Sequence, residues 1–244
     1  MPEWTAEQAA ARMESLADHD FPDPTQLREL YLSMLQAGDS RCPGENLDEL
    51  ADGSIPLGGC TSSTGYHYVG LSEFTESNDD GWSFALTLGD LYITDPDGDT
   101  FSAGGTFSYD AKVTAAGSQW EGDATGTFSY PGGTHWIAEG GSLAYWVEGG
   151  TAADHAWLLL SGSIGGPLGT DNLYFDQLLY DSDCGESPVG GLRVRGGDGR
   201  WYHLEFDANC SGCGELTFSD TVEMGQVCVD LKSLGAELIE RMAL

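Results

Sequence analysis

The stretch Thr100–Thr114, TFSAGGTFSYDAKVT, alternates between two kinds of side chain without a break. The first set is apolar or small: Phe101, Ala103, Gly105, Phe107, Tyr109, Ala111 and Val113. The intervening set is mostly hydroxyl-bearing or charged: Ser102, Gly104, Thr106, Ser108, Asp110, Lys112 and Thr114. A period of two predicts a β-strand with one face on a core and the other in water. At about 3.3 Å per residue the strand would span about 50 Å, so we expect it to bend.

A second stretch, Trp120–Tyr130, repeats this alternation. The residues between the two stretches, AAGS at 115–118, predict a reversal of the chain. The fragment GTFSY at 105–109 recurs at 126–130, which indicates neighbouring strands under similar packing demands, not a solenoid repeat. Gly and Ala on the apolar faces permit the curvature of a barrel or a curled sheet.

Further strands are predicted from about Tyr66 onward, separated by short Gly, Asp and Ser clusters that favour an antiparallel meander over βαβ units. Gly89 and Asp90 shift the phase of the alternation, which predicts a bulge. The predicted ranges are Gly81–Thr94, Leu143–Val147, Ala156–Ile164, Leu173–Tyr180, Leu192–Arg195, Trp201–Phe206 and Glu215–Phe218.

Helical signals lie at the two ends of the chain. Thr5 and Gln8 resemble a capping box, and Asp23-Pro24-Thr25 predicts the start of a second helix, which ends at Gly38. The tail from Leu231 is also helical in pattern. We therefore expect a mainly all-β fold, an antiparallel meander forming a curled sheet, barrel or half-barrel with short terminal α-helices. The expected division is a helical segment at 1–40 packed on the sheet, a β domain at 41–230 and a C-terminal helix at 231–244.

The charge balance limits the partners. The 244 residues include 40 Asp and Glu but only 9 Lys and Arg, which gives a net charge of -31 and a pI near 4.1. Nucleic acid is excluded by repulsion and an anionic membrane surface is disfavoured, whereas a cationic partner or a divalent cation is not. Salt adaptation and ordinary secreted acidity both explain this composition. No run approaches the roughly 18 apolar residues of a transmembrane helix.

Six cysteines predict an oxidising compartment and therefore an exported protein, extracellular or in the cell envelope. The opening Met1–Trp4 does not resemble a signal peptide, so we expect the export signal to be absent from this chain. A Cys42–Cys60 disulfide would close a loop of about 18 residues. For the remaining four, Cys184, Cys210, Cys213 and Cys228, two disulfides are favoured over a zinc site, because only one close pair is present; their connectivity stays open.

The turn Asp95-Pro96-Asp97-Gly98-Asp99 is the candidate cation site. Asp95, Asp97 and Asp99 stand at alternate positions, as in the first half of a calcium loop, and carboxylates suit Ca²⁺. The following Thr100 occupies the position where the EF-hand pattern has Gly, and no Glu closes the loop. An ordinary Asp-Gly hairpin turn is the alternative interpretation.

Catalytic motifs are not evident in the sequence: it has no Gly-x-Ser-x-Gly elbow, His-Glu-x-x-His helix or phosphate loop, and its His residues are scattered. Enzyme activity is therefore left uncertain, with a non-catalytic role favoured. Strand-borne carboxylates beside aromatics keep a glycoside-cleaving alternative open: Glu121, Glu139, Glu148 and Glu205. The aromatic residues Trp146, Tyr145 and Trp120 are candidate ligand-binding residues, although most aromatics in strands fill the core.

The C-terminal third carries a distinctive set of residues, among them Cys184-Gly185, Arg193-Val194-Arg195, Trp201-Tyr202, Cys210-x-x-Cys213-Gly214 and Cys228-Val229-Asp230-Leu231. In these residues it resembles an uncharacterised β-rich module of myxobacterial exported proteins and lipoproteins. The resemblance implies placement in the envelope or outside the cell and stabilisation by disulfides. It implies no reaction and no catalytic residues.

Together these observations favour a non-catalytic exported or cell-surface module, binding or structural, whose partner is an unknown protein, glycan or apolar ligand. One alternative is a carrier that holds an apolar ligand in a half-barrel cavity. The other is a glycan-binding or glycan-cleaving β-sandwich.

Overall fold

The computed structural model describes residues 1–15, 23–43, 59–79, 81–131, 140–152, 155–165, 172–185 and 187–242. Within these ranges twelve strands form one sheet in which every strand lies beside the next strand of the chain. The strands are β1 (Cys60–Thr61), β2 (His67–Ser77), β3 (Trp82–Thr94), β4 (Thr100–Thr114), β5 (Gly117–Ser129), β6 (Gly141–Ala152), β7 (His155–Gly165), β8 (Asn172–Asp181), β9 (Val189–Arg195), β10 (Trp201–Phe206), β11 (Cys213–Phe218) and β12 (Val222–Cys228).

The expected mainly-β antiparallel meander with terminal helices is confirmed, and the sheet does not close into a barrel. The described helices are α1 (Ala6–Glu14), α2 (Pro24–Gln36), α5 (Lys232–Met242) and the short 3₁₀ helix η1 (Ser182–Cys184). Thr5 and Gln8 form the predicted capping box of α1, and the Asp23 side chain accepts a hydrogen bond from the Gln26 N–H at the start of α2.

The alternation that predicted β4 is realised as far as Ala111, whereas Val113, a member of the apolar set, is exposed. Phe101, Phe107 and Tyr109 are buried on one face, while Thr106 on the other face is exposed. The predicted bulge lies between Leu88 and Leu91 of β3, where the pairing with β4 shifts. Local periodicity was sufficient here because each strand has one apolar and one hydrated face.

The chain divides into two compact units. One unit comprises Met1–Phe21, Val113–Glu121 and Tyr145–Leu244, and the other comprises Pro22–Lys112 and Gly122–Ala144. We call them the C-terminal unit and the central unit. The central unit holds α2, and the C-terminal unit holds α1, η1 and α5.

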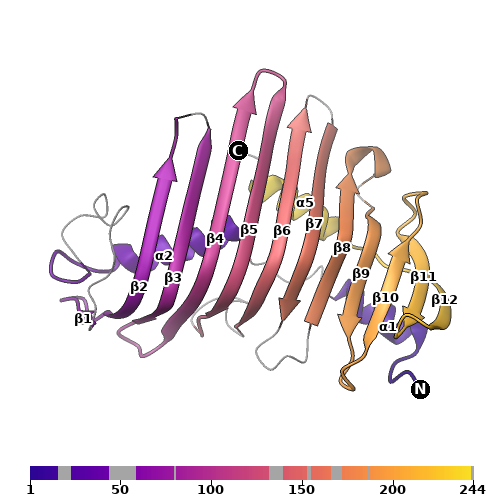
Figure 1. Cartoon of the computed structure of the whole chain (residues 1–244), viewed down its shortest axis with the longest axis horizontal. Coiled ribbons are helices and arrows are strands. Elements are labelled where there is room, and N and C mark those ends of the chain that lie inside the picture. Colours follow the sequence, from indigo (N-terminus) through magenta and orange to yellow (C-terminus); the bar gives the residue numbers. More distant parts are fainter. Residues whose placement is uncertain are drawn as a thin grey trace. The chain divides into compact units, whose positions relative to one another are not determined.

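In the central unit α2 packs directly on β2 and its neighbours (Figure 1). The Tyr31 hydroxyl donates to the Ser72 hydroxyl at 2.8 Å, and the Tyr68 hydroxyl donates to the Met34 carbonyl at 2.8 Å. All four side chains are buried. The tyrosine rings therefore fill space between this helix and the sheet, in the region where the carrier hypothesis requires a ligand cavity.

Arg28 fixes α2 from outside this core. Its guanidinium lies 5.0 Å from the ring centre of Trp82 and 5.6 Å from those of Phe74 and Phe84. The same group donates to both carboxylate oxygens of Glu76 at 2.7 Å, and the Trp82 indole N–H also donates to Glu76. Helix and strands are thus joined by cation–π contacts and charge-assisted hydrogen bonds.

This arrangement predicts an acid-dependent contribution to stability. Burial raises the pKa of Glu76, but hydrogen bonds from Trp82 and Arg28 and the Arg28 charge outweigh burial, so the pKa is lowered from its ordinary value of 4.5. The ionised Glu76 carboxylate contributes its full stabilisation at pH values above 4.5. This contribution is lost as the pH falls through the lower pKa of Glu76 in the folded protein. We expect Glu76→Gln to lower the free energy of unfolding by about 1–2 kcal/mol at pH 7.

The difference between wild type and Glu76→Gln should shrink as the pH is lowered below 4.5, because protonated Glu76 no longer differs in charge from glutamine. Urea unfolding of both proteins across pH 7 to 3 measures it, and the general repulsion of an acidic chain largely cancels in the comparison. A difference independent of pH would contradict the assignment.

In the C-terminal unit the two terminal helices, α1 and α5, pack on the sheet. Before α1, the Trp4 ring stacks on Tyr202 with ring centres 4.8 Å apart, and the Trp4 N–H donates to the Tyr202 hydroxyl at 2.7 Å. In α5, a Cβ on Gly235 would lie 2.2 Å from the ring of Tyr180. Glycine at this position lets α5 approach the face of β8 that carries Tyr180.

Candidate metal-binding site

The start of β7 and the end of β8 bring a histidine and an aspartate together. Trp157 of β7 is paired with Asp181 of β8 in the antiparallel register. Side chains alternate along a strand, so His155 lies on the same face as Trp157, next to Asp181. Leu158 and Tyr180 occupy the opposite face and are buried. The site therefore lies on the face away from α5.

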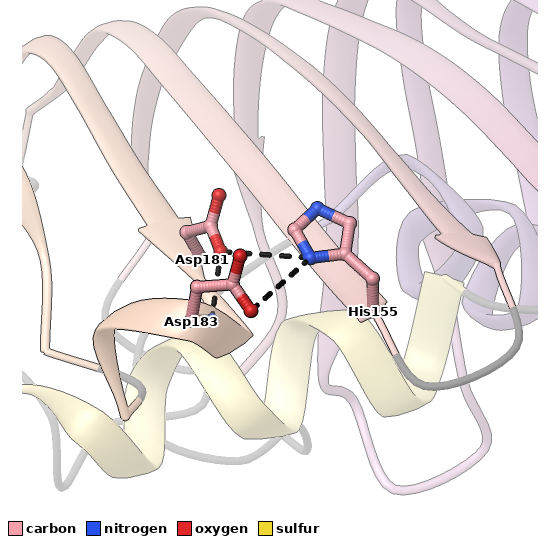
Figure 2. Close-up of side chains that lie close together, drawn as sticks. All are labelled: His155, Asp181 and Asp183. Atoms are coloured by element: carbon pink, nitrogen blue, oxygen red, sulfur yellow. Dashed lines mark hydrogen bonds and ion pairs between the residues drawn. The ribbon is translucent and has the colours of Figure 1, made fainter.

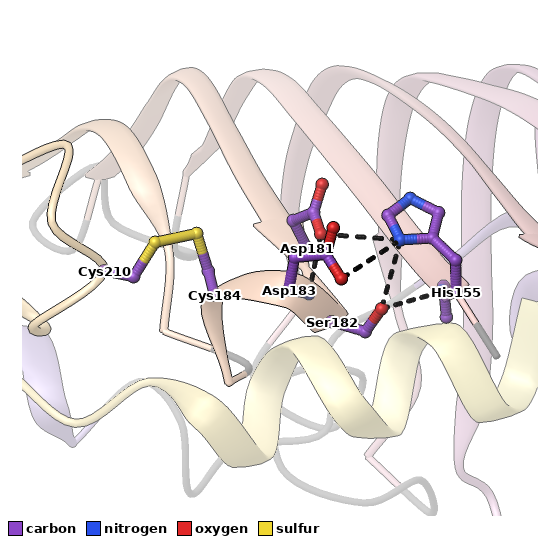
Figure 3. Close-up of polar contacts among 7 residues, drawn as sticks. His155, Asp181, Ser182, Asp183, Cys184 and Cys210 are labelled. Atoms are coloured by element: carbon purple, nitrogen blue, oxygen red, sulfur yellow. Dashed lines mark hydrogen bonds and ion pairs between the residues drawn. A yellow bond between two sulfur atoms is a disulfide. The ribbon is translucent and has the colours of Figure 1, made fainter.

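A second aspartate follows immediately, because β8 continues into η1. The Asp181 carboxylate accepts a hydrogen bond from the Asp183 N–H at 2.8 Å, which caps this short helix. Gly185 ends it with a left-handed φ of 58°, and its N–H donates to the Ser182 carbonyl at 3.1 Å. The Cys184–Cys210 disulfide anchors the same turn to a distant loop of the unit (Figure 3).

The three side chains point toward one another (Figure 2). His155 Nδ1 lies 3.7 Å from Asp181 Oδ1 and 3.9 Å from Asp183 Oδ1. One potential metal-binding atom from each residue lies within 4.8 Å of those from the other two. Within the described part of the chain, no other group of three or more His, Cys, Asp or Glu residues meets this distance limit. Their side-chain exposures are 38%, 27% and 87% respectively, so solvent reaches the cluster.

Ser182 also contacts the histidine, but not as a catalytic nucleophile would. Its hydroxyl lies 3.3 Å from His155 Nδ1 and accepts a hydrogen bond from the Ala156 N–H at 3.0 Å (Figure 3). In a Ser-His-Asp triad, the hydroxyl and the carboxylate engage opposite ring nitrogens. Here both approach Nδ1, so this geometry does not support nucleophilic catalysis.

A small pocket of about 230 Å³ lies beside the cluster, and His155 belongs to the cluster and also lines the pocket. The neighbouring wall contains Trp157, Gly150 and Gly117, together with Ser118 and Thr151, whose hydroxyls are 2.6 Å apart. Pockets for drug-sized ligands typically measure 300–1,000 Å³. This one therefore suits a few waters or a small polar molecule.

Sequence reasoning did not find this cluster. Ser182, which stands between the two aspartates, is 27 residues from His155, and the scattered histidines of the sequence do not indicate that His155 lies beside them. The one available signal was Asp181-x-Asp183 directly after a predicted strand. The pairing register of β7 with β8, which places the start of β7 beside the end of β8, could not be predicted from the sequence.

The Asp95, Asp97 and Asp99 turn joins β3 to β4. Asp95 Oδ1 accepts hydrogen bonds from the N–H groups of Asp97 at 3.0 Å and Asp99 at 2.9 Å, and Asp95 Oδ2 accepts from the Tyr130 hydroxyl at 3.2 Å. Gly98 supplies the left-handed residue with a φ of 96°. These contacts are those of a hairpin turn, and calcium binding by it stays a prediction.

Calcium binding here predicts a thermal shift. Millimolar Ca²⁺ should raise the midpoint of thermal unfolding, because a ligand that binds only the folded state stabilises it. Replacing Asp97, an exposed residue, by Ala should abolish the rise without changing the midpoint in the absence of calcium. An unchanged midpoint of the wild-type protein at millimolar Ca²⁺ would refute the hypothesis.

The candidate ligand-binding aromatics differ in exposure. Trp120 is 3% exposed and Tyr145 is 2% exposed, whereas Trp146 is partly exposed. A Cβ on Gly149 would lie 2.6 Å from the Trp120 ring, so this indole packs on the backbone of β6. Ligand binding by these three residues stays a prediction. The side chains of Trp120 and Tyr145 are buried in the core.

The cysteines form three disulfides. Cys42 pairs with Cys60 as predicted. The connectivity that the sequence left open is resolved as Cys184–Cys210 and Cys213–Cys228. Near the first bridge, the Ser63 side chain and the N–H groups of Ser63, Arg41 and Cys42 form hydrogen bonds with the Asp39 carboxylate, and these lower its pKa to about 2.

Among the described strand-borne glutamates, Glu121 and Glu148 lie on neighbouring strands and Glu205 does not. Glu121 lies on β5, Glu148 on β6 and Glu205 on β10, and Glu139 lies outside the described residues. The Glu205 carboxylate is 3.3 Å from His203 Nε2 of the same strand. Glu205 is therefore separated by several strands from the other two and cannot act with them on one glycosidic bond.

Comparison of the chain with protein-family models, with curated proteins and with solved structures finds no match.

Proposed function

We propose that the protein is a non-catalytic, exported or cell-surface binding module stabilised by disulfides. The observation that carries this proposal is the oxidation of every cysteine: three disulfides consume all six thiols, and both units contain at least one. Such bridges persist outside the reducing cytosol. The resemblance of the C-terminal third to a module of exported proteins supports the same compartment.

We place binding on the sheet face opposite α2 in the central unit. In the central unit this face carries hydroxyl-bearing side chains in register, such as Thr87 of β3 opposite Thr106 of β4. Both are exposed, as is Thr75 of β2, which lies opposite Ala85. Small polar side chains on an uncovered sheet offer hydrogen bonds to a protein or glycan without a hydrophobic requirement. Among the described residues no helix combines the length and apolarity needed to cross a membrane.

The carrier alternative receives less support. Tyr31, Tyr68, Leu27 and Leu35 occupy the space between α2 and the strands, and each is at most 3% exposed. A carrier would need these side chains to leave room for an apolar ligand. The surface-binding interpretation needs no such rearrangement.

Production of the same chain in the periplasm and in the cytosol of a bacterial host tests the compartment. Periplasmic protein should be folded and resist alkylation, and its mass should lie about 6 Da below that of the reduced chain. Native mass spectrometry of that protein should show the chain without a bound lipid. Six free thiols in a folded, protease-resistant protein would overturn the proposal, and a stoichiometric co-purified lipid would replace it by the carrier function.

A further inference from the structure

We propose that His155, Asp181 and Asp183 bind one Zn²⁺ ion, with one coordination position left for water or a small ligand. This inference is independent of the compartment and the binding partner proposed above. It rests on the convergence of three donor atoms from β7, β8 and η1 at one point on the surface of the C-terminal unit (Figure 2).

The donor set points to zinc. Imidazole nitrogen suits Zn²⁺ and its transition-metal neighbours, whereas Ca²⁺ and Mg²⁺ prefer oxygen-only sites. A set of one imidazole and two carboxylates falls in the first class, because the nitrogen donor excludes a hard-cation preference. Zinc sites with three protein ligands keep the fourth position open, in contrast to the closed four-ligand sites of structural zinc.

The distances fit this assignment. Donor atoms around a tetrahedral zinc lie about 3.4 Å apart, given bonds of about 2.0–2.1 Å. His155 Nδ1 lies 3.7 and 3.9 Å from the two aspartate oxygens, so these two pairs must close by a few tenths of an ångström. The donor oxygens of Asp181 and Asp183 lie within 4.8 Å of each other. Both carboxylates approach the same ring nitrogen, which is the requirement for chelation of a single ion. Asp183, with its side chain 87% exposed, is free to make that adjustment.

The backbone holds the ligands in place before an ion binds. The Asp183 N–H fixes the Asp181 carboxylate, and the Cys184–Cys210 disulfide restrains the turn that carries Asp183 (Figure 3). On the other side, the Ala156 N–H binds the Ser182 hydroxyl and ties η1 to β7. Groups that orient metal ligands in this way typically contribute 10–100-fold to affinity.

The surroundings provide access and a favourable potential. The pocket of about 230 Å³ is lined by His155, so an ion can enter from solvent and water can occupy the fourth position. The net charge of -31 raises the local concentration of cations near the surface. All six cysteines are in disulfides, so thiolates do not compete for the metal.

The chain contains a matched control. His203 also lies beside two carboxylates, with Nε2 3.3 Å from Glu205 and Nδ1 3.9 Å from Asp220. These carboxylates approach opposite nitrogens of the ring, so they cannot bind one ion together with a single nitrogen. His203→Ala therefore removes an imidazole in a similar charge environment without removing a chelating set.

Isothermal titration of metal-stripped, oxidised protein without a histidine tag, with ZnCl₂ as the probe, tests the proposal. We expect one Zn²⁺ per chain in wild type and in His203→Ala, with dissociation constants within about twofold of each other. His155→Ala and Asp183→Asn should each weaken binding by about tenfold or more. Ca²⁺ at millimolar concentration should not compete. Circular dichroism without metal should be the same for all four proteins, and Asp183→Asn, at an exposed side chain, serves if His155→Ala does not fold.

Two results would overturn the assignment. One is the absence of saturable Zn²⁺ binding below about 100 μM, which is too weak for a chelating three-ligand site. The other is equal weakening by His203→Ala and His155→Ala, which would indicate diffuse attraction of cations to an acidic surface. Substitution with Co²⁺ provides a further readout, since a tetrahedral site gives an intense visible absorption that His155→Ala should remove.

Discussion

Gly105→Ala is expected to lower the free energy of unfolding of the central unit by about 4 kcal/mol or more, whereas Gly104→Ala should be close to neutral. A Cβ on Gly105 would lie 2.1 Å from the Thr125 carbonyl oxygen and 2.5 Å from the Gly126 Cα, and the residue has a φ of +127°. Both neighbours are backbone atoms of the adjacent strand and cannot move aside. A Cβ on Gly104 would have its nearest neighbours at 3.8–3.9 Å, an ordinary contact distance.

Urea unfolding followed by circular dichroism measures both variants. Gly98→Ala separates the two contributions at Gly105, because Gly98 also has a positive φ, +96°, but open space around its would-be Cβ. Its cost should be limited to the backbone strain of about 1 kcal/mol. Equal unfolding midpoints for Gly104→Ala and Gly105→Ala would show that β4 and β5 do not approach as described.

Reduction of the disulfides should largely unfold the protein. The bridges close loops with sequence separations of 18, 26 and 15 residues. Each is expected to contribute about 3 kcal/mol by restricting the unfolded chain. Three such contributions approach the total stability of about 5–15 kcal/mol of ordinary domains. The midpoint of thermal unfolding should therefore fall by tens of degrees in a phosphine reductant.

Double serine variants of each cysteine pair, melted without reductant, separate the three bridges. Removal of Cys42–Cys60 should affect the central unit, and removal of Cys213–Cys228 should affect β11 and β12 of the C-terminal unit. Alkylation and mass measurement after reductant treatment confirm that the bonds were broken. A fully reduced protein with the same midpoint as the oxidised one would contradict the prediction.

The elements whose signals are local could be predicted from the sequence. The alternation in Thr100–Thr114 gave β4 with its bounds, and the phase shift at Gly89 and Asp90 gave the bulge in β3. The capping residues Thr5 and Asp23 marked the starts of α1 and α2. In each case the deciding interactions are between residues a few positions apart, so the pattern is visible in the chain itself.

None of the predicted strand ranges covers β1, β2 or β12. For β12 the reason is physical. β12 lies at the end of the strand order, and its residues, Val222–Cys228, are all exposed or only partly buried. Without a buried face an edge strand has no need for alternating apolar residues. Its pairing with β11 holds it in place instead, together with the Cys213–Cys228 bridge.

By itself the sequence determined the fold class, the positions of most strands and helices, and the oxidised state expected of six cysteines. Only the tertiary structure decided which of the last four cysteines pair, how Arg28 joins α2 to Glu76 and Trp82, and that His155 meets Asp181 and Asp183. These contacts depend on strand register and on the packing of segments far apart in the chain. A register shift of one residue would turn His155 and Asp181 to opposite faces, and the composition of the strands would be unchanged.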